Sequence, residues 1–136
     1  MSDTTRSSTA TGGEGVAITE TDRLTASDKV EGTAVYNRAG ESIGSIYTLM
    51  IDKRSGQVEY AVMSFGGFLG IGERYHPLPW KALAYDTRQG GYVADVSREQ
   101  LERAPSFARD EVPWDDPAYG HSVYAYYGMA YPIGVF

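Results

Sequence analysis

The side chains that most often carry out chemistry are few or scattered in this sequence. It has 2 histidines, His76 and His121, and neither has a close-spaced partner of the kind that metal sites use, although both can be drawn around an ion with Asp115 or Asp116. Carboxylates are numerous, but no spacing selects an acid/base pair. Cysteine is absent, which excludes thiol nucleophiles and thiolate ligands. We therefore predict ordinary polar or half-buried histidines and a protein that is not an enzyme, with no catalytic residue, metal or cofactor.

A glycine-rich run at residues 66–72, GGFLGIG, invites comparison with a phosphate-binding loop. It lacks the Gly-Lys-Ser/Thr ending of that motif, and the residues after it favour an extended strand rather than a helix whose N-terminus holds an anion. We expect its glycines to allow tight bends at the corner of a small β-barrel. The apolar residues of the run and a nearby tryptophan are candidate binding residues: Phe68, Leu69, Ile71 and Trp80.

The strongest signal is aromatic and lies near the C-terminus. Tyrosine and tryptophan combine a large contact area with a polar tip and are favoured at interfaces. Tyr119, Val123 and Tyr127 recur at helical spacing and predict one face that packs back on the domain. Gly120 lies inside this helix at a cost of about 1 kcal/mol relative to alanine, so the face must pack on something. The other tyrosines cannot all share it, which leaves them for contacts between chains. The candidate interaction residues are Trp114, Tyr119, Val123, Tyr124, Tyr126, Tyr127 and Tyr131.

Acidic residues surround the start of this aromatic segment. Asp110-Glu111 and Asp115-Asp116 form a patch that contains no Lys or Arg. One interpretation is a solvated linker followed by a helix N-cap, since carboxylates are favoured at helix N-termini. The functional alternative is a docking site for a basic partner.

Length and charge narrow the function further. With 136 residues and 42% hydrophobic residues, the chain fits one globular domain with appendages. Its net charge of -6, with Lys53-Arg54 as the only adjacent basic pair, argues against a nucleic-acid partner, because phosphate neutralisation needs a clustered basic face. No apolar signal-peptide segment is visible, and the uncharged residues 117–136 are too polar to span a bilayer. We expect a cytoplasmic protein.

The elements that position these residues are mostly strands. Residues 1–22 are rich in Thr, Ser and Gly and predict a flexible tail. Residues 23–105 predict a barrel domain, with tight turns at 37–40 and 52–56. The predicted strands are residues 32–36, 43–51, 58–65, 74–78, 82–85 and 92–96. The fourth contains Pro77, which cannot donate to a ladder, so it lies at an edge or ends there.

The face pattern of the two longest strands predicts how they are buried. Strict alternation divides residues 43–51 between two faces. One face carries Ile43, Tyr47, Leu49 and Ile51, and the other carries Ile46 and Met50. Residues 58–65 are partly apolar on both faces, whereas a sheet wetted on one side alternates more cleanly. We therefore predict a small closed barrel whose outer face is covered in places by a helix, a tail or a second subunit.

The pattern becomes helical after the strands. A Ser-x-x-Gln capping box at residues 97–100 predicts a short helix that ends at Pro105. Residues 106–136 are predicted to be a linker followed by a C-terminal tyrosine-rich helix. Asp116-Pro117 supplies its N-cap and first residue, and Gly128 stops it.

Several short motifs, in a fixed order, resemble the PRC-barrel family, which is named for the cytoplasmic domain of the photosynthetic reaction-centre H subunit. The resemblance extends from about residue 30 to residue 105. The matching pieces are Val30-Glu31-Gly32 with Val35-Tyr36, Gly40-Glu41 with Ile43-Gly44-Ser45-Ile46, Gly56-x-Val58-Glu59-Tyr60, Gly66-Gly67-Phe68-Leu69-Gly70, Pro77-Leu78-Pro79-Trp80, Gly90-Gly91-Tyr92 and Gln100-Leu101.

This resemblance implies a mainly β fold: a small antiparallel barrel of six strands, with a short helix after the last strand and a C-terminal aromatic helix. The chain is most similar to short stand-alone bacterial members. The family has no shared catalytic residues, so the resemblance implies an adaptor or assembly role, and we expect a self-associating homodimer. The alternative is a barrel that binds a small apolar or quinone-like ligand near Phe68, Leu69 and Trp80. Peripheral association with a membrane protein is a further possible partnership that the family implies.

Overall fold

The computed structural model of the chain describes residues 23–66 and 73–132. The chain divides into two units, Met1–Glu31 and Gly32–Phe136. The first contains one short helix, α1 (Ser27–Val30). The predicted flexible tail and the loop candidates Phe68, Leu69 and Ile71 lie outside the described residues. The features below belong to the second unit.

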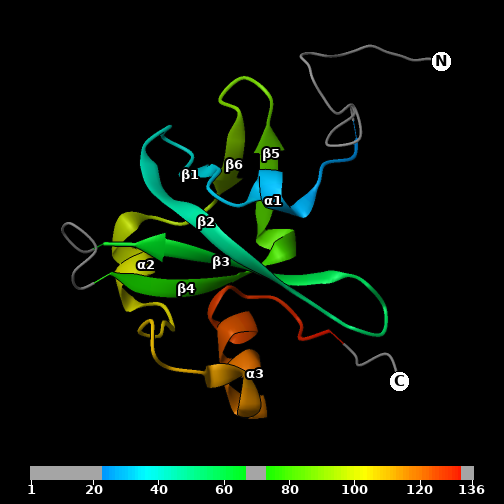
Figure 1. The fold of residues 1–136 in the computed structure, drawn as a ribbon. Coiled ribbons are helices and arrows are strands. Elements are labelled where there is room, and N and C mark those ends of the chain that lie inside the picture. Colours follow the sequence, from blue (N-terminus) through cyan, green and yellow to red (C-terminus); the bar gives the residue numbers. More distant parts are fainter. Residues whose placement is uncertain (1–22, 67–72, 133–136) are drawn as a thin grey trace. The chain divides into compact units, whose positions relative to one another are not determined.

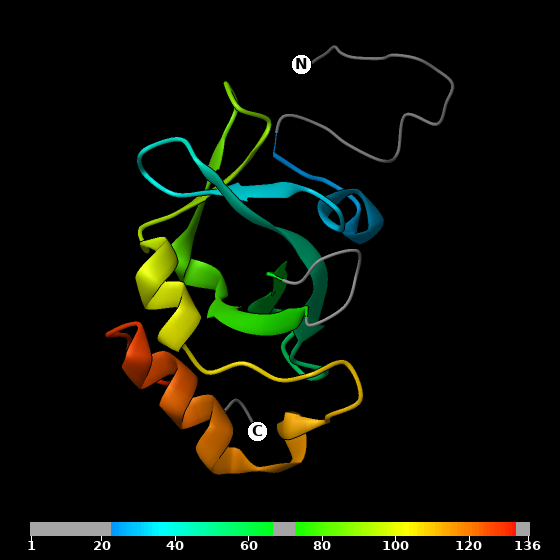
Figure 2. The same cartoon turned by 90° about the vertical axis from the view of Figure 1, so that its left-hand side faces the viewer.

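The second unit is built on a 6-stranded sheet in the order β4-β3-β2-β1-β6-β5. Its strands curl around a core in Figures 1 and 2. The strands are β1 (Ala34–Tyr36), β2 (Ser42–Ile51), β3 (Val58–Phe65), β4 (Arg74–Pro79), β5 (Leu83–Asp86) and β6 (Gly91–Ala94), with a 3-10 turn, η3 (Trp80–Ala82), between β4 and β5. The predicted mainly β fold class is confirmed. So is the edge position of the proline-containing strand β4.

Two features of the sheet differ from the prediction of a closed antiparallel barrel. First, β1 pairs with β6 in parallel, with Val35 opposite Tyr92. On its other side β6 pairs antiparallel with β5, so the parallel pair is confined to β1 and β6. Second, β4 and β5 are the two ends of the strand order, so the sheet is curled and open between them.

The alternation predicted for β2 is wrong, because β2 contains bulges. Ile43 and Ile46 are both buried, at 1% exposure each, although strict alternation puts them on opposite faces. In the pairing of β2 with β1, Val35 lies opposite Gly44 and the next residue, Tyr36, lies opposite Ser42. Ile43 therefore has no partner in β1 and forms a bulge. A second shift, opposite β3, leaves Tyr47 unpaired between Ile46 and Thr48. Each extra residue exchanges the two faces for the rest of the strand.

Both faces of β3 are covered, as its apolar pattern predicted. Four consecutive residues, Tyr60 to Met63, are buried. On one face, the C-terminal segment packs on Tyr60 and Val62. In Figures 1 and 2 this segment lies against the side of the sheet formed by β3 and β4. A sheet buried on both faces requires such a second layer.

The residues after α2 (Arg98–Arg103) are not the simple linker that was predicted. Phe107 and Tyr75 exchange two backbone hydrogen bonds, each 2.9 Å long, so the chain pairs briefly with the outer edge of β4. A 3-10 turn, η4 (Pro113–Asp115), follows. The sequence pattern missed this pairing because it depends on two residues far apart in the chain rather than on a local period.

The two predicted helices are present with their predicted ends. In α2, Ser97 and Gln100 form the complete capping box. The Asp116 side chain caps α3 (Pro117–Tyr126), and Gly128 adopts the left-handed φ of 70° that lets the chain leave the helix. Figure 2 shows α2 and α3 side by side, and the Tyr126 hydroxyl donates a hydrogen bond to the Gln100 carbonyl between them.

One titratable residue of the core is a histidine. His76 on β4 is 2% exposed, and its Nδ1 atom is buried with no hydrogen-bond partner among the described residues. Its ring meets that of Phe65 edge-on, with the centroids 5.5 Å apart. Burial, reinforced by the positive charge of Arg74, lowers the pKa of His76 to about 4. The imidazole is therefore neutral in the folded protein at pH 7.

The free energy of unfolding should consequently fall as the pH drops from 7 to 5. The unfolded chain takes up a proton at His76 near the ordinary histidine pKa of 6.5, whereas the folded chain does so only near pH 4. The unfolded state therefore binds more protons across this window, which costs about 2 kcal/mol of stability between pH 7 and pH 5. Urea denaturation at a series of pH values measures this loss.

Two variants identify the group responsible. His76→Gln removes the buried imidazole, so its stability should depend less on pH over this range, even where the variant is itself less stable. His121→Gln changes an exposed histidine of α3 and should keep the wild-type dependence. An unchanged slope in His76→Gln would contradict the assignment to His76.

Candidate functional site

A layer of aromatic rings fills the space between the sheet and the C-terminal segment. Its centre is Tyr60 of β3, which is 5% exposed. The rings of Trp114 and Tyr124 each lie with their centroids 5.4 Å from that of Tyr60. Further ring contacts extend the layer in both directions along the series Tyr47, Tyr75, Phe107, Trp114, Tyr60, Tyr124, Tyr131 and His121.

The tyrosine hydroxyls within this layer differ in their hydrogen bonding, and one of them links α3 to β3. The Tyr124 hydroxyl donates a hydrogen bond of 2.9 Å to the backbone carbonyl of Glu59. The buried hydroxyls of Tyr119 and Tyr127 have no hydrogen-bond partner among the described residues. Burial raises the pKa of Tyr60, Tyr119 and Tyr124, the last two to about 12, so these phenols stay neutral at physiological pH.

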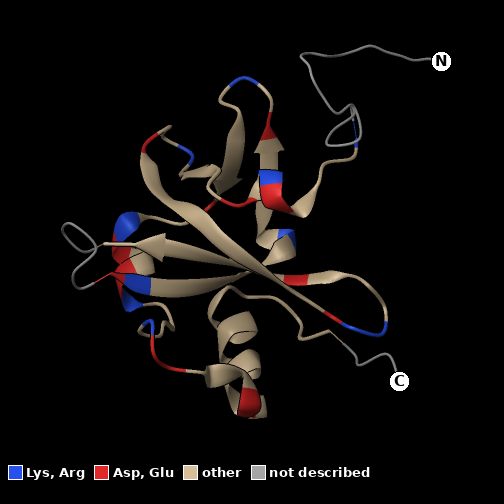
Figure 3. Cartoon of the chain, in the orientation of Figure 1, with Lys and Arg blue, Asp and Glu red and all other residues tan. Residues whose placement is uncertain are grey.

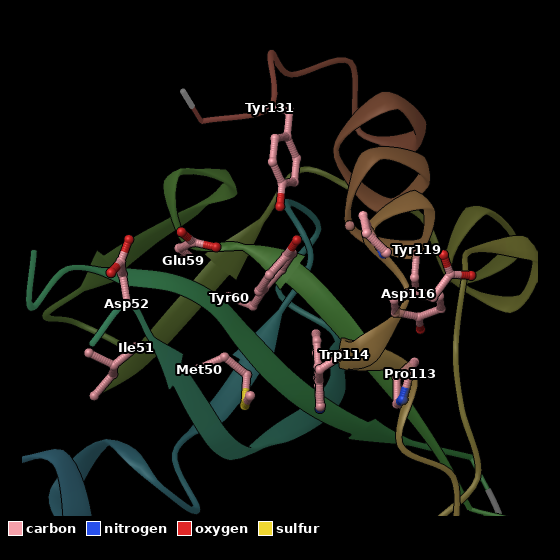
Figure 4. A pocket seen from close by; sticks show the side chains of 12 residues that line it. Met50, Ile51, Asp52, Glu59, Tyr60, Pro113, Trp114, Asp116, Tyr119 and Tyr131 are labelled. Carbon is pink, nitrogen blue, oxygen red and sulfur yellow. The ribbon is translucent and has the colours of Figure 1, made fainter. Parts of the chain in front are cut away.

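A hollow of about 200 Å³ opens beside Tyr60, between the β2–β3 hairpin and the start of α3 (Figure 4). We refer to it as the aromatic hollow. Its lining residues are Met50, Ile51, Asp52, Glu59, Tyr60, Pro113, Trp114, Asp116, Pro117, Tyr119, Gly120 and Tyr131.

The aromatic hollow combines ring walls with carboxylates at its ends. Figure 4 shows the carboxylates of Asp52 and Glu59 close together at one end and Asp116 at the other. Asp116 caps α3 by accepting a hydrogen bond from the Ala118 N–H. Asp52 accepts hydrogen bonds from the backbone of its own hairpin loop, including one of 2.8 Å from the Arg54 N–H. The described lining contains no Lys, Arg or His, so no basic side chain within the lining compensates the charge of these carboxylates.

Glu59 differs from the other two carboxylates. Its side chain has no hydrogen bond or ion pair with any described residue, and it lies beside the carboxylate of Asp52. Burial and then the charge of Asp52 raise the pKa of Glu59. A cation placed beside Glu59 would offset the repulsion between its carboxylate and that of Asp52.

The structure brings most of the predicted interaction residues together. Trp114, Tyr119 and Tyr131 line the aromatic hollow. Val123 and Tyr124 are buried in the layer beneath it, although we expected the tyrosines off the packed face to be free for other chains. Tyr126 and Tyr127 lie at the C-terminal end of α3 and do not line the hollow. Tyr127 is half-buried and Tyr126 is 40% exposed, and the centroids of their rings are 5.1 Å apart.

The remaining predicted residues lie elsewhere. Trp80 is half-buried on η3, where its ring contacts that of Tyr92 at 5.5 Å, and it does not line the aromatic hollow. The histidines are not brought together around carboxylates: His76 is buried on β4, and His121 is stacked on Tyr131 with centroids 4.0 Å apart. Within residues 23–66 and 73–132, no group of three His, Asp or Glu side chains is arranged to hold a metal ion.

Sequence reasoning missed half of the site. The β2–β3 hairpin contributes Asp52, Glu59 and Tyr60, which were not among the predicted site residues, although Glu59 and Tyr60 belong to one of the short pieces that resemble the family. One signal was available: Gly120, the unfavourable glycine inside a helix. A Cβ atom on Gly120 would lie 2.6 Å from the Tyr60 hydroxyl oxygen, so the absence of a side chain at this position leaves room for Tyr60.

The fold defines a curled β domain to which an aromatic C-terminal helix is attached. Comparison with known families identifies it: residues 24–101, more than half of the chain, match the PRC-barrel domain. The chain belongs to the PRC-barrel family. No curated protein matches it. The family match includes the hairpin side of the aromatic hollow and ends before Trp114, Tyr119 and Tyr131, so the other side is built by residues beyond the matched region.

The close approach at Gly120 leads to a prediction about stability. Gly120→Ala should destabilise the protein, although alanine is the better helix former by about 1 kcal/mol. The new methyl group would push on Tyr60, whose ring is held by Trp114 and Tyr124. We expect overpacking to dominate and to lower the free energy of unfolding by about 1–2 kcal/mol net, measured by urea denaturation.

Ala125→Gly provides the matched control, because Ala125 is an exposed residue of the same helix. This change removes helix propensity alone and should cost about 1 kcal/mol. If Gly120→Ala were more stable than the wild type, the contact with Tyr60 would not be limiting and the packing argument would be wrong.

Proposed function

We propose that this PRC-barrel protein is a non-enzymatic interaction or assembly module that self-associates as a homodimer in the cytoplasm. The observation that carries the proposal is the apolar surface left exposed around the aromatic hollow. Ile51 is 50% exposed, Val112 is 69% exposed and Tyr131 is 37% exposed. Ile51 and Tyr131 line the hollow, and Val112 precedes Pro113, which also lines it. Such a cluster is typical of protein contact sites.

The composition of the C-terminal helix supports the same proposal. α3 has no Lys, Arg, Asp or Glu between Pro117 and Tyr126, and its ribbon in Figure 3 is tan, with acidic residues only at its start. The cores of protein interfaces are depleted in charged residues and enriched in tyrosine and tryptophan. A helix of this kind is suited to contacting another protein.

The lining of the aromatic hollow supports binding rather than catalysis. Its described residues include no Ser, Thr, His or Lys, so no hydroxyl or amine nucleophile of those types lies beside a general base. The aromatic and carboxylate groups that are present are suited to contacts with a protein partner.

Nucleic acid is not a proposed partner. The chain carries a net charge of -6, and the aromatic hollow is itself acidic. Association with a membrane protein is compatible with the proposal only as a peripheral contact. No helix in the part of the chain that the structure describes is long and apolar enough to cross a membrane.

Point substitutions test self-association better than removal of the C-terminal segment. Trp114, Val123 and Tyr124 cover the outer face of β3, so a shortened chain would expose Tyr60 and Val62 and aggregate for that reason alone. Exposed positions avoid this problem because they contribute little to the core.

The double variant Ile51→Glu with Val112→Glu should be monomeric, whereas the wild type should have twice the chain mass of 14.9 kDa. Four charges placed in a symmetric contact would be desolvated against one another, which an interface does not tolerate. Light scattering on a sizing column, across a dilution series, measures the mass.

Tyr85→Glu is the control, because Tyr85 is 54% exposed on β5 and does not line the aromatic hollow. It should remain dimeric. A wild type with a single-chain mass at every concentration would overturn self-association, and a dimeric Ile51→Glu, Val112→Glu variant would overturn the assignment of this surface.

A further inference from the structure

The size of the aromatic hollow limits what it can bind. Pockets for drug-sized ligands have volumes of about 300–1,000 Å³, and this hollow has about 200 Å³. The end of one long side chain is of suitable size for it, whereas a drug-sized ligand is larger than the hollow. The ligand is a small group, or a small part of a larger partner.

The chemistry of the lining indicates a positive charge on that group. The rings of Tyr60 in β3, Trp114 in η4 and Tyr131 after α3 line the hollow. In Figure 4, Tyr60 lies between the carboxylates of Asp52 and Glu59 on one side and Trp114 and Asp116 on the other. Aromatic faces attract cations, with tryptophan the strongest, and the attraction grows when water is excluded. The described lining provides no Lys or Arg that would already supply this charge.

A metal ion suits the hollow poorly. Calcium and magnesium require six or more oxygen ligands, and much of this lining is aromatic and apolar. The Oδ1 atoms of Asp52 and Asp116 already accept hydrogen bonds from backbone N–H groups, which leaves fewer oxygen atoms for a metal ion. An organic cation makes different demands: it needs apolar contact around its carbon atoms and one or two carboxylates near its N–H groups, and both are present.

We propose that the aromatic hollow is a binding site for an organic cation, the guanidinium or ammonium end of an arginine or lysine side chain that another polypeptide inserts. The charged end would lie beside Glu59 and Asp52, and the methylene groups would pack between Tyr60, Trp114 and Tyr131. The proposal rests on the proposed function in one respect, because it takes the cation to be carried by an associating protein chain.

Tryptophan provides a direct probe, since the chain has 2 tryptophans and only Trp114 lines the hollow. The cationic probes are N-acetyl-arginine amide and N-acetyl-lysine amide, and N-acetyl-citrulline amide is the uncharged match to arginine. In NMR titrations, the cationic probes should shift the indole N–H signal of Trp114 saturably and leave that of Trp80 unchanged. A saturable shift with citrulline of equal affinity, or none with either cation, would overturn the proposal.

A pair of charge-neutralising variants tests the carboxylates. Asp52→Asn with Glu59→Gln keeps side-chain size and keeps an oxygen to accept the hairpin hydrogen bonds of residue 52. It should weaken the binding of N-acetyl-arginine amide about tenfold. Glu99→Gln with Glu102→Gln removes the same charge from exposed positions on α2 and should change binding less than about twofold, as expected for screened charges. Equal losses in the two variants would show that only net charge matters and would overturn the site.

The source of the cation is distinguished by a third variant. Lys53 and Arg54 lie at the tip of the β2–β3 hairpin, next to Asp52, and are visible as the basic tip in Figure 3. If Lys53 or Arg54 of a second copy supplies the cation, the variant Lys53→Gln with Arg54→Gln should be monomeric and should still bind the probe. If the cation comes from a different protein, or from another basic residue of a second copy, this variant should keep its wild-type assembly state and probe affinity. Both results support the site. A monomeric wild type that still binds the cationic probes would contradict self-association and leave the site standing.

Discussion

The burial of β3 on both faces is the constraint on which the rest of this structure depends. Tyr60, Val62 and their neighbours form an uninterrupted buried run, so the sheet cannot leave its outer face in water. The C-terminal segment provides the required second layer through Trp114, Val123 and Tyr124. Although this segment lies beyond the residues that match the family, it belongs to the core of the folded unit. Any partner surface on α3 is therefore limited to the residues that this packing leaves exposed.

Features with local signals were predictable from the sequence, and features that depend on distant pairing were not. The capping box of Ser97 and the edge strand around Pro77 follow from the chemistry of a few adjacent residues. The burial of Ile43 beside that of Ile46 depends on a bulge that exists only in the register with β1. The pairing of Phe107 with Tyr75 joins segments far apart in the chain and leaves no periodic trace.

The same division applies to the candidate site. Its tyrosines and Trp114 were evident because aromatic residues are concentrated in one segment, and helical spacing correctly grouped Tyr119 with Val123. Their partners on the hairpin were not evident, because Glu59 and Tyr60 lie in an ordinary strand pattern. Gly120 was the residue of this site whose type is unfavourable inside a helix. A local cost of this kind indicates a demand from elsewhere in the fold, here the space taken by Tyr60.

The carboxylates of the aromatic hollow differ in what the fold itself requires. Asp116 caps a helix and Asp52 orders a hairpin loop, so structure alone accounts for both. Glu59 has no such role: its backbone carbonyl holds Tyr124, but its side chain has no hydrogen bond or ion pair with any described residue. A carboxylate in a partly desolvated place beside a second one costs stability, which its raised pKa reflects. A glutamine would keep the backbone contact without that cost. No described contact within the isolated chain requires the charge of Glu59, which is consistent with the proposed cation site.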